Sequence, residues 1–251
     1  MTLLAVRNLI KSFGGVHAVR EVSFALDAGE RLAIIGPNGA GKSTCFNIVG
    51  GQLRPDEGRV MLAGEDVTGL KPHEIWAKGV GRTFQIATAF GSMSVVENVQ
   101  MVLMRHAGRL RAFWPPARRE ARAAAMALLD RVGMADQAER PAAVLAYGDI
   151  KRVELAIALA HDPVLLLMDE PTAGMAPRER QALMELTSAI VAERGVALLF
   201  TEHDMDVVFT HADRILVLAR GAIIAEGPPE AIRNDPEVQA IYLGHGFGEA
   251  P

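Results

Sequence analysis

The sequence predicts an α/β fold with a mainly parallel sheet, a small antiparallel β subdomain near the N-terminus and an inserted α-helical subdomain. Continuous apolar runs recur at Arg31–Gly36 and Val164–Glu170, and such runs are typical of strands buried on both faces. Helix patterns separate the runs and supply the crossovers that parallel strands need. A mostly helical stretch, residues 87–162, lies between them.

The first 30 residues alternate loosely between apolar and polar side chains around a turn at Phe13–Gly15. This alternation predicts short strands in a small, partly antiparallel sheet. Two later runs, Val196–Phe200 and Arg214–Ala219, add strands to the parallel sheet. The apolar members of the first segment are Leu3, Ala5, Val19, Val22, Phe24 and Leu26.

The middle of the chain is predicted to be helical, with Gly133 as a C-terminal helix cap and a break at Pro115 and Pro116. The segment Arg105–Arg119 interleaves arginines with two aromatic residues, which suits contact with lipid headgroups or nucleic acid as well as a solvated loop. We expect one domain over residues 1–251, with an α/β core at 1–86 and 163–251 and a helical subdomain at 87–162. The arginines of this segment are Arg105, Arg109, Arg111, Arg118 and Arg119, and its aromatic residues are Phe113 and Trp114.

Composition excludes several classes of protein. Half of the 251 residues are hydrophobic, enough for a substantial core. The net charge of −4 gives no global positive field, which argues against nucleic acid as a partner. Cys45 is the only cysteine, which excludes an internal disulfide and fits a reducing cytosol. Arg7 and Lys11 interrupt the N-terminus before a signal peptide can form, and no run approaches the roughly 18 apolar residues of a membrane span. We therefore expect any membrane role to be peripheral.

A phosphate-binding loop follows the first apolar run directly. GPNGAGKST has the pattern GxxxxGK[ST] between a predicted strand and a predicted helix. Its glycines let backbone N–H groups face a phosphate chain, Lys42 reaches the β and γ phosphates, and Ser43 can ligate Mg²⁺. The sequence thus predicts a P-loop NTPase core. The predicted nucleotide-binding residues of the loop are Gly36, Pro37, Asn38, Gly39, Ala40, Gly41, Lys42, Ser43 and Thr44.

Three polar residues follow other apolar runs. Asp169 ends one run and can point a carboxylate at the Mg²⁺ shell, while Glu170 could deprotonate a water that attacks the γ phosphate. His203 follows Val196–Phe200 closely, so it should emerge at the same carboxyl edge of the sheet, where open α/β sheets bind ligands.

The order of these motifs resembles the ATP-binding-cassette (ABC) ATPase family over almost the whole chain. GPNGAGKST resembles its Walker A motif, TFQ its Q-loop, LAYGD its signature motif, VLLLMDEP its Walker B motif and EHD its switch histidine. The resemblance implies ATP and Mg²⁺ as ligands and Phe13 stacked on adenine. It also implies that Gln85 touches the Mg²⁺ or the water, that His203 contacts the γ phosphate, and that Ala146, Tyr147 and Gly148 contact the ATP of a partner chain.

A closer likeness is to the ATP-binding subunit of branched-chain amino-acid importers, carried by GRTFQ, LAYGD and the ending AIYLG. Related cassettes for urea, short amides or aromatic acids share much of it. The likeness implies a second cassette, same or related, in a head-to-tail dimer, transmembrane permease subunits, and indirectly an extracytoplasmic solute-binding protein. It also implies a peripheral location on the cytoplasmic face of the inner (plasma) membrane.

The sequence departs from the family at two places. The usual signature is LSGGQ, whereas here Ala146 lacks the hydroxyl, Tyr147 replaces the first glycine and Asp149 replaces glutamine. Gly148 and the helix start would then carry the phosphate contact, with Asp149 turned away towards the dipole of its own helix. After the Walker B motif, Ala176 stands where many cassettes have an acid or amide, which weakens any polar contact there.

Other functions remain open at this stage. A soluble ABC ATPase acting on nucleic acid or ribosomes would explain the arginine-rich segment, although such proteins often carry two cassettes or a coiled-coil insert. A lipid-exporter cassette would keep the transport role but reverse its direction. A P-loop kinase or GTPase of another family would leave LAYGD and His203 unexplained.

Overall fold

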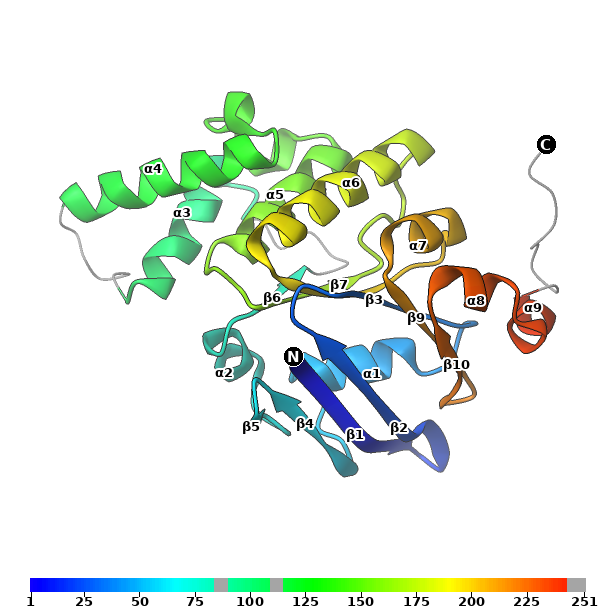
Figure 1. Cartoon of the computed structure of the whole chain (residues 1–251). Coiled ribbons are helices and arrows are strands. Elements are labelled where there is room, and N and C mark those ends of the chain that lie inside the picture. The colour runs from blue at the N-terminus through cyan, green and yellow to red at the C-terminus, as the bar shows by residue number, and fades with distance from the viewer. Residues whose placement is uncertain (84–89, 109–114, 243–251) are drawn as a thin grey trace.

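The computed structural model contains two sheets with helices between and outside them (Figure 1). The structure describes residues 1–83, 90–108 and 115–242, except for the side chains of residues 115–118 and of Tyr242. A six-stranded sheet has the order β10-β9-β3-β8-β7-β6, and a four-stranded sheet has the order β2-β1-β4-β5. The alternation of helices with buried parallel strands makes this an α/β fold, as predicted.

The six-stranded sheet is parallel except for its β9–β10 pair. Its central strands are buried along their length except for Arg31 at the start of β3, because their apolar runs meet side chains on both faces. All four predicted runs form strands of this sheet, whereas β6 and β10 were not predicted. The six strands are β3 (Arg31–Ile35), β6 (Val80–Thr83), β7 (Leu165–Asp169), β8 (Ala197–Thr201), β9 (Arg214–Ala219) and β10 (Ala222–Gly227).

The four-stranded sheet is antiparallel. The predicted turn joins its first two strands, but these are long rather than short, with irregular register along their pairing. In the first strand Leu4 and Val6 are buried, whereas Leu3 and Ala5 are only partly buried, so the more buried face of this strand carries Leu4 and Val6. The strands are β1 (Thr2–Phe13), β2 (Val16–Asp27), β4 (Glu57–Leu62) and β5 (Glu65–Asp66).

Alternate residues of the parallel strands pack into two different cores. Ala33 and Ile35 face a core shared with the helices that follow β6 and β7. Leu32 and Ile34 face a second core, which includes α1 (Lys42–Val49) and the antiparallel sheet. Figure 1 shows α1 on one side of the six-stranded sheet, with α5 and α6 on the other. The period-2 alternation of strand side chains therefore separates the helix after the P-loop from the helix of the signature motif.

Helices predominate between β6 and β7, as expected for residues 87–162. Pro115 and Pro116 begin a helix instead of interrupting one, because proline is tolerated in the first helical turn, where its missing N–H has no intrahelical partner. Gly133 has a φ of 69° and its N–H donates to the Asp130 carbonyl at 3.0 Å, as a C-terminal cap should. The elements are α3 (Val95–His106), α4 (Pro115–Arg131), the 3₁₀ helices η1 (Ala135–Gln137) and η2 (Ala142–Val144), and α5 (Tyr147–Leu159).

The remaining helices lie near the edge strand β6 or follow the last strands. α6 packs on α5 and α7, and α8 packs on β9 and β10. None of the helices in the described parts of the chain is long and apolar enough to cross a membrane. Their bounds are α2 (Pro72–Ala77), α6 (Pro177–Arg194), α7 (Met205–His211), α8 (Pro229–Arg233) and α9 (Pro236–Tyr242).

Candidate nucleotide site

The predicted site residues converge at the carboxyl edge of the six-stranded sheet. Ile34 pairs with Thr201, and Thr201 pairs with Asp169, so β3, β8 and β7 end side by side. The P-loop leaves β3 at this edge, Glu170 follows β7, and His203 follows β8. The sheet register therefore brings three separate motifs together, as expected for an open α/β sheet.

Two glycines of the P-loop are required by close backbone contacts. A Cβ on Gly36 would lie 2.2 Å from the Leu218 carbonyl oxygen, and a Cβ on Gly41 would lie 2.3 Å from that of Ala18. Gly41 also has a φ of 103° and is the residue from which α1 begins. The loop is thus a tight cradle whose backbone N–H groups and helix start suit an anion.

Lys42 is a buried cation at the centre of this cradle, only 6% exposed. Its Nζ donates hydrogen bonds to the carbonyl oxygens of Gly36 at 2.7 Å and of Pro37 at 3.2 Å. Burial lowers the pKa of the ammonium, and the nearby carboxylates of Glu170 and Asp169 oppose that shift. The lysine therefore lies within electrostatic reach of both predicted acids.

Asp169 is held by side chains from neighbouring elements. The Thr201 hydroxyl donates to its Oδ1 at 2.7 Å, and a guanidinium nitrogen of Arg82 lies 3.9 Å from its Oδ2. Arg82 in turn donates to Asn47 Oδ1 at 2.7 Å and lies over the Phe46 ring, so it links β6 to α1. These contacts fix the carboxylate at the end of β7, where it can serve as a metal ligand.

Glu170 and His203 form a side-chain pair. His203 Nε2 lies 2.8 Å from Glu170 Oε1, and the two side chains are 50% and 21% exposed. Glu170 has a φ of 48°, which is uncommon for a residue with a Cβ, and its N–H donates to the carbonyl and hydroxyl oxygens of Thr201. The backbone of Glu170 is therefore fixed by the neighbouring strand while its carboxylate faces solvent and the histidine.

A buried glutamate, Glu202, lies behind this pair. Its Oε1 accepts hydrogen bonds from the N–H and hydroxyl of Thr172 at 2.8 and 2.7 Å, and its Oε2 accepts from the N–H of His203 at 3.1 Å. Burial raises the pKa of this carboxyl, and these three bonds oppose the rise. The sequence motifs did not single out Arg82, Thr172, Thr201 or Glu202 as parts of the site, although the Glu of EHD, directly before His203, was a visible signal.

The signature segment begins α5 on the opposite face of the sheet from α1. Ala146 takes the N-cap position with no side-chain hydrogen bond, so the N-terminal N–H groups have no help from a capping side chain. Asp149 lies in the first turn, where a negative charge suits the helix dipole. Tyr147 is half-exposed, and a Cβ on Gly174 would lie 3.6 Å from its ring.

The remaining predicted residues differ in how they are placed. Phe13 is 46% exposed beside the β1–β2 turn, and Lys11 Nζ lies over its ring, 5.5 Å from the centroid. Ser43 is exposed on the first turn of α1. Ala176 begins α6 without a polar side chain, and Glu179 accepts a hydrogen bond from its N–H. Gln85 and residues 109–114 of the Arg105–Arg119 segment lie outside the described residues, as do the side chains of residues 115–118.

Comparison with known proteins agrees with this geometry. A family model described as ABC transporter matches residues 19–173, and a model described as branched-chain amino acid ATP-binding cassette transporter matches residues 222–248. The chain is 39% identical to the high-affinity branched-chain amino acid transport ATP-binding protein BraF of Pseudomonas aeruginosa, over 96% of this chain and 98% of that protein. The chain belongs to the ABC transporter ATP-binding cassette family. It is an ATPase subunit of the transporter class, as the motifs predicted.

Further comparisons extend over the whole cassette. It is 40% identical to LivG of Salmonella typhimurium, a protein with the same description as BraF, over 96% of this chain and 98% of that protein. The ADP conformation of MJ1267, an ATP-binding cassette of an ABC transporter, has a TM-score of 0.86 and 33% identity, and covers 98% of this chain and 100% of that chain. The dimeric structure of the bacterial ABC transporter cassette MJ0796 has a TM-score of 0.78 and 26% identity, with 90% and 99% covered. The predicted P-loop NTPase fold is confirmed.

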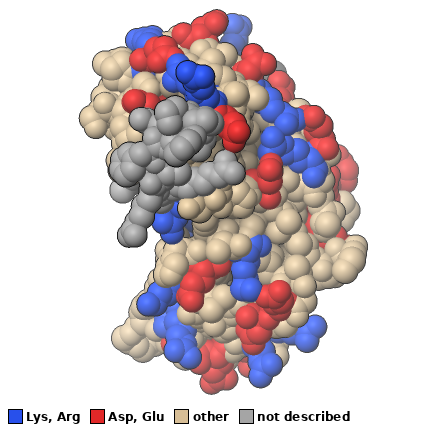
Figure 2. All heavy atoms as spheres, turned by 90° about the vertical axis from the view of Figure 1, so that its left-hand side faces the viewer, with Lys and Arg blue, Asp and Glu red and all other residues tan. Residues whose placement is uncertain are grey.

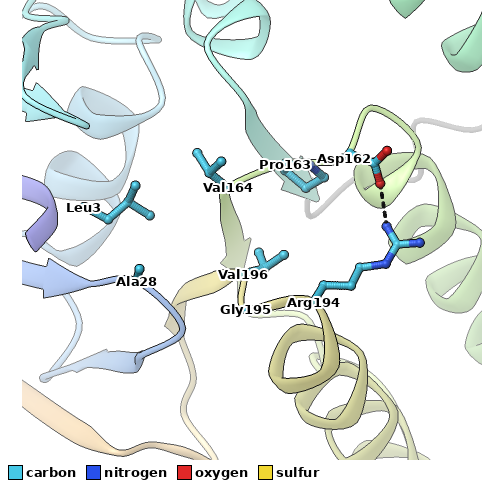
Figure 3. A pocket seen from close by; sticks show the side chains of 8 residues that line it. All are labelled: Leu3, Ala28, Asp162, Pro163, Val164, Arg194, Gly195 and Val196. Carbon is cyan, nitrogen blue, oxygen red and sulfur yellow. Dashed lines mark hydrogen bonds and ion pairs between the residues drawn. The ribbon is translucent and has the colours of Figure 1, made fainter. Parts of the chain in front are cut away.

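A separate pocket of about 500 Å³ lies at the opposite edge of the sheet. Val164 and Val196, which precede β7 and β8, line it beside each other, and Leu3 and Ala28 face them from the antiparallel sheet (Figure 3). Because the P-loop lies at the carboxyl ends of the strands, this pocket at their amino ends is distinct from the candidate nucleotide site.

Proposed function

We propose that this cassette hydrolyses ATP to power an importer of branched-chain amino acids or related small solutes. The observation that carries the proposal is the near full-length similarity to ATP-binding proteins described as high-affinity branched-chain amino acid transport components. The separate match of residues 222–248 to the branched-chain amino acid cassette model supports the same substrate class. Substrate choice itself would lie in permease subunits and an extracytoplasmic binding protein.

The nucleotide would occupy the cradle at the carboxyl edge of the sheet. Phe13 would stack on adenine, the P-loop N–H groups and Lys42 would hold the phosphates, and the tight backbone contacts of Gly36 and Gly41 support this fit. Ser43, Asp169 and Gln85 supply oxygen donors, the ligand type that Mg²⁺ prefers. When bound, Mg²⁺ would neutralise charge on the phosphates.

Glu170 and His203 would carry the hydrolytic step. Glu170 would accept a proton from the attacking water as a general base, and its carboxylate is partly exposed next to a buried cation. His203 would contact the γ phosphate and orient Glu170 through their 2.8 Å contact. Gln85 would contact the same water or Mg²⁺ and signal to the membrane subunits.

We further propose a head-to-tail pair of cassettes, the same or related. Ala146, Tyr147 and Gly148 begin a helix on the opposite side of the sheet from α1, and so they suit the nucleotide of a partner better than their own. Only the γ phosphate would contact the P-loop of one cassette and the signature helix of the other at the same time, so ATP would favour the closed pair. Residues 1–86 and 163–251 would act as the core, and residues 87–162 as a helical subdomain that moves with closure.

The cassette would work as a peripheral subunit on the cytoplasmic face of the inner (plasma) membrane, against transmembrane permease chains. The alternative of nucleic-acid or ribosome binding has less support. On the described part of the face that carries α2 and α3, Lys and Arg side chains are interspersed with Asp and Glu (Figure 2). A mixed surface of this kind gives little of the counterion release that drives nucleic-acid binding. None of the relatives and structures reported above is described as a lipid exporter.

Uptake and co-purification test the proposal together. In cells that lack this chain, the wild type should restore uptake of labelled leucine. Lys42→Ala should not restore it, because the variant lacks the cation that would bind the phosphates. Pull-down from solubilised membranes should recover two multi-spanning permease chains. Leucine uptake that does not depend on the chain would contradict the substrate, whereas capture of ribosomal or nucleic-acid complexes would favour the soluble alternative.

A further inference from the structure

We propose that Glu202 is a positioning residue that fixes the catalytic Glu170–His203 pair by joining the two backbone segments that carry it. This inference rests on the proposed roles of Glu170 and His203. It concerns a side chain away from the protein surface, because Glu202 is only 4% exposed.

The contacts of Glu202 reach both segments at once. Its Oε1 accepts from the N–H and the hydroxyl of Thr172, two residues after Glu170. Its Oε2 accepts from the N–H of His203, the other member of the pair. The three donors converge on one buried carboxylate from two loops that follow different strands of the sheet. The carboxylate therefore sets the spacing between those loops.

The backbone of Glu170 depends on such a restraint. Its φ of 48° is unfavourable for a residue with a side chain, and it persists only where neighbouring contacts fix the chain on both sides. Thr201 holds the Glu170 N–H on one side, and the Glu202–Thr172 bonds hold the chain on the other. Loss of these bonds would let the loop relax and would move the Glu170 carboxylate away from His203 Nε2.

Glu202→Gln tests this arrangement with little change of volume. The amide oxygen can accept from Thr172 or from His203, but the amide nitrogen then faces an N–H donor on the other side, so at least one bond is lost in either orientation. We expect kcat for ATP hydrolysis to fall by about tenfold or more, because small displacements of catalytic groups are costly. The affinity for ATP should change little, and the melting temperature should fall no further than in Thr187→Val, which also loses a buried hydrogen bond.

Substitutions at Thr172 test the same contact from the other side. Thr172→Val removes the hydroxyl donor and should lower kcat several-fold, and Thr172→Ser keeps the hydroxyl and should restore most of it. Thr187→Val is the matched control, because Thr187 is a fully buried threonine whose hydroxyl donates to the Leu183 carbonyl on α6, away from the site. That variant should keep its kcat.

The outcomes separate this inference from the proposed function. ATP hydrolysis by the wild type that is abolished by Lys42→Ala establishes the site, and failure there overturns the proposed function. If the site is established but Glu202→Gln and Thr172→Val keep kcat within about twofold, Glu202 has no positioning role. A fall in kcat that parallels loss of melting temperature, and that Thr187→Val shares, would likewise overturn the inference.

Discussion

Ala146 lacks the hydroxyl that a serine would have, so neighbouring groups have to supply the phosphate contact of the proposed dimer. A serine at this position would cap the helix or donate its hydroxyl to a phosphate, and Ala146 does neither. A hydrogen bond to a charged group contributes about 1.5–3 kcal/mol. The N–H groups at the start of α5 must therefore supply the contact that the proposed dimer requires, and Gly148, in the first turn, leaves the approach to them open.

His161 is a buried residue whose protonation opposes folding. It is 3% exposed and stacked on Trp76 at a centroid distance of 4.7 Å, with His106 beside it at 6.1 Å. Neither ring nitrogen has a hydrogen-bond partner of normal geometry within the described residues, although the backbone of Val80 lies close enough to oppose part of the pKa shift of His161. Burial, and to a smaller extent the charge of His106, lowers the pKa of His161 from 6.5 to about 4. Between these values the unfolded chain binds a proton that the folded chain does not.

Stability should therefore fall as the pH drops from 6.5 towards 4, by up to about 3 kcal/mol from this residue. His161→Phe keeps a ring against Trp76 and removes the titration, so its unfolding free energy should depend less on pH over that window. Urea denaturation at a series of pH values measures the difference. His106→Phe, at the exposed neighbour, should keep most of the wild-type slope, because burial is a larger cause of the His161 pKa shift than the charge of His106. The same slope for wild type and His161→Phe would contradict the assignment.

At the scale of elements, the sequence was informative where burial is two-sided. The runs that became β3, β7, β8 and β9 are continuous and apolar, and no surface segment produces that pattern. β10 was missed because it is only partly buried, and β6, the four-residue edge strand Val80–Thr83, is too short to show a period. Pro115 was misjudged because the same residue that breaks a helix interior also favours its first turn.

The site divides in the same way. Lys42, Asp169, Glu170 and His203 were predictable because each follows a strand or occupies a motif of fixed spacing. The side chains that orient them were not, because they act through contacts between elements far apart in the chain. Thr201 reaches Asp169 across a pair of strands, and Glu202 reaches Thr172 across two loops. Local sequence does not specify such tertiary contacts, even where the residue itself stands in a motif, as Glu202 does in EHD.

The start of α5 can be tested by substituting Gly148, which should affect ATP turnover by a pair of chains but not the folding of one chain. A Cβ on Gly148 would lie no closer than 3.6 Å to Glu179 and Met175, which is ordinary contact, and Gly148 does not have a positive φ. The fold of a single chain therefore does not require glycine there. Gly148→Leu should fold and bind ATP nearly as well as wild type, but it should lose at least about a hundredfold in turnover if this helix start approaches the partner's phosphate.

Equilibrium binding of ATP to the monomer and steady-state hydrolysis measure the two parts of this prediction. Gly148→Ala is a graded control, because its methyl group fits the single chain and obstructs an approaching phosphate less than leucine does. Normal turnover in Gly148→Leu would contradict a role for the signature helix in the active site. Loss of ATP binding by the monomer would indicate damage within one chain instead.

At the scale of the whole molecule, the six-stranded sheet divides the chain into two halves with separate cores. α1 and the antiparallel sheet share one core, and α5 and α6 share the other (Figure 1). Each half carries the start of one helix, α1 or α5, to which the proposed function assigns a phosphate contact. In that proposal each chain supplies one side of two different nucleotide sites, and a head-to-tail pair completes both sites.

This organisation predicts that ATP turnover and pairing of chains are linked through Glu170. Glu170→Gln removes the general base but leaves Lys42 and the P-loop intact, so hydrolysis should slow by on the order of a hundredfold or more. The γ phosphate then stays bound between the P-loop of one chain and the signature helix of the other, and it favours the closed pair. Size-exclusion chromatography with light scattering should show a dimer in saturating MgATP and a monomer without it.

Two control variants test whether the dimer depends on the nucleotide site. Glu185→Gln, the same change at an exposed position of α6, should remain monomeric and hydrolyse ATP normally. Glu170→Gln combined with Lys42→Ala should not dimerise. If Glu170→Gln stays monomeric in saturating MgATP and hydrolyses it at the wild-type rate, the clamp mechanism is wrong for this cassette.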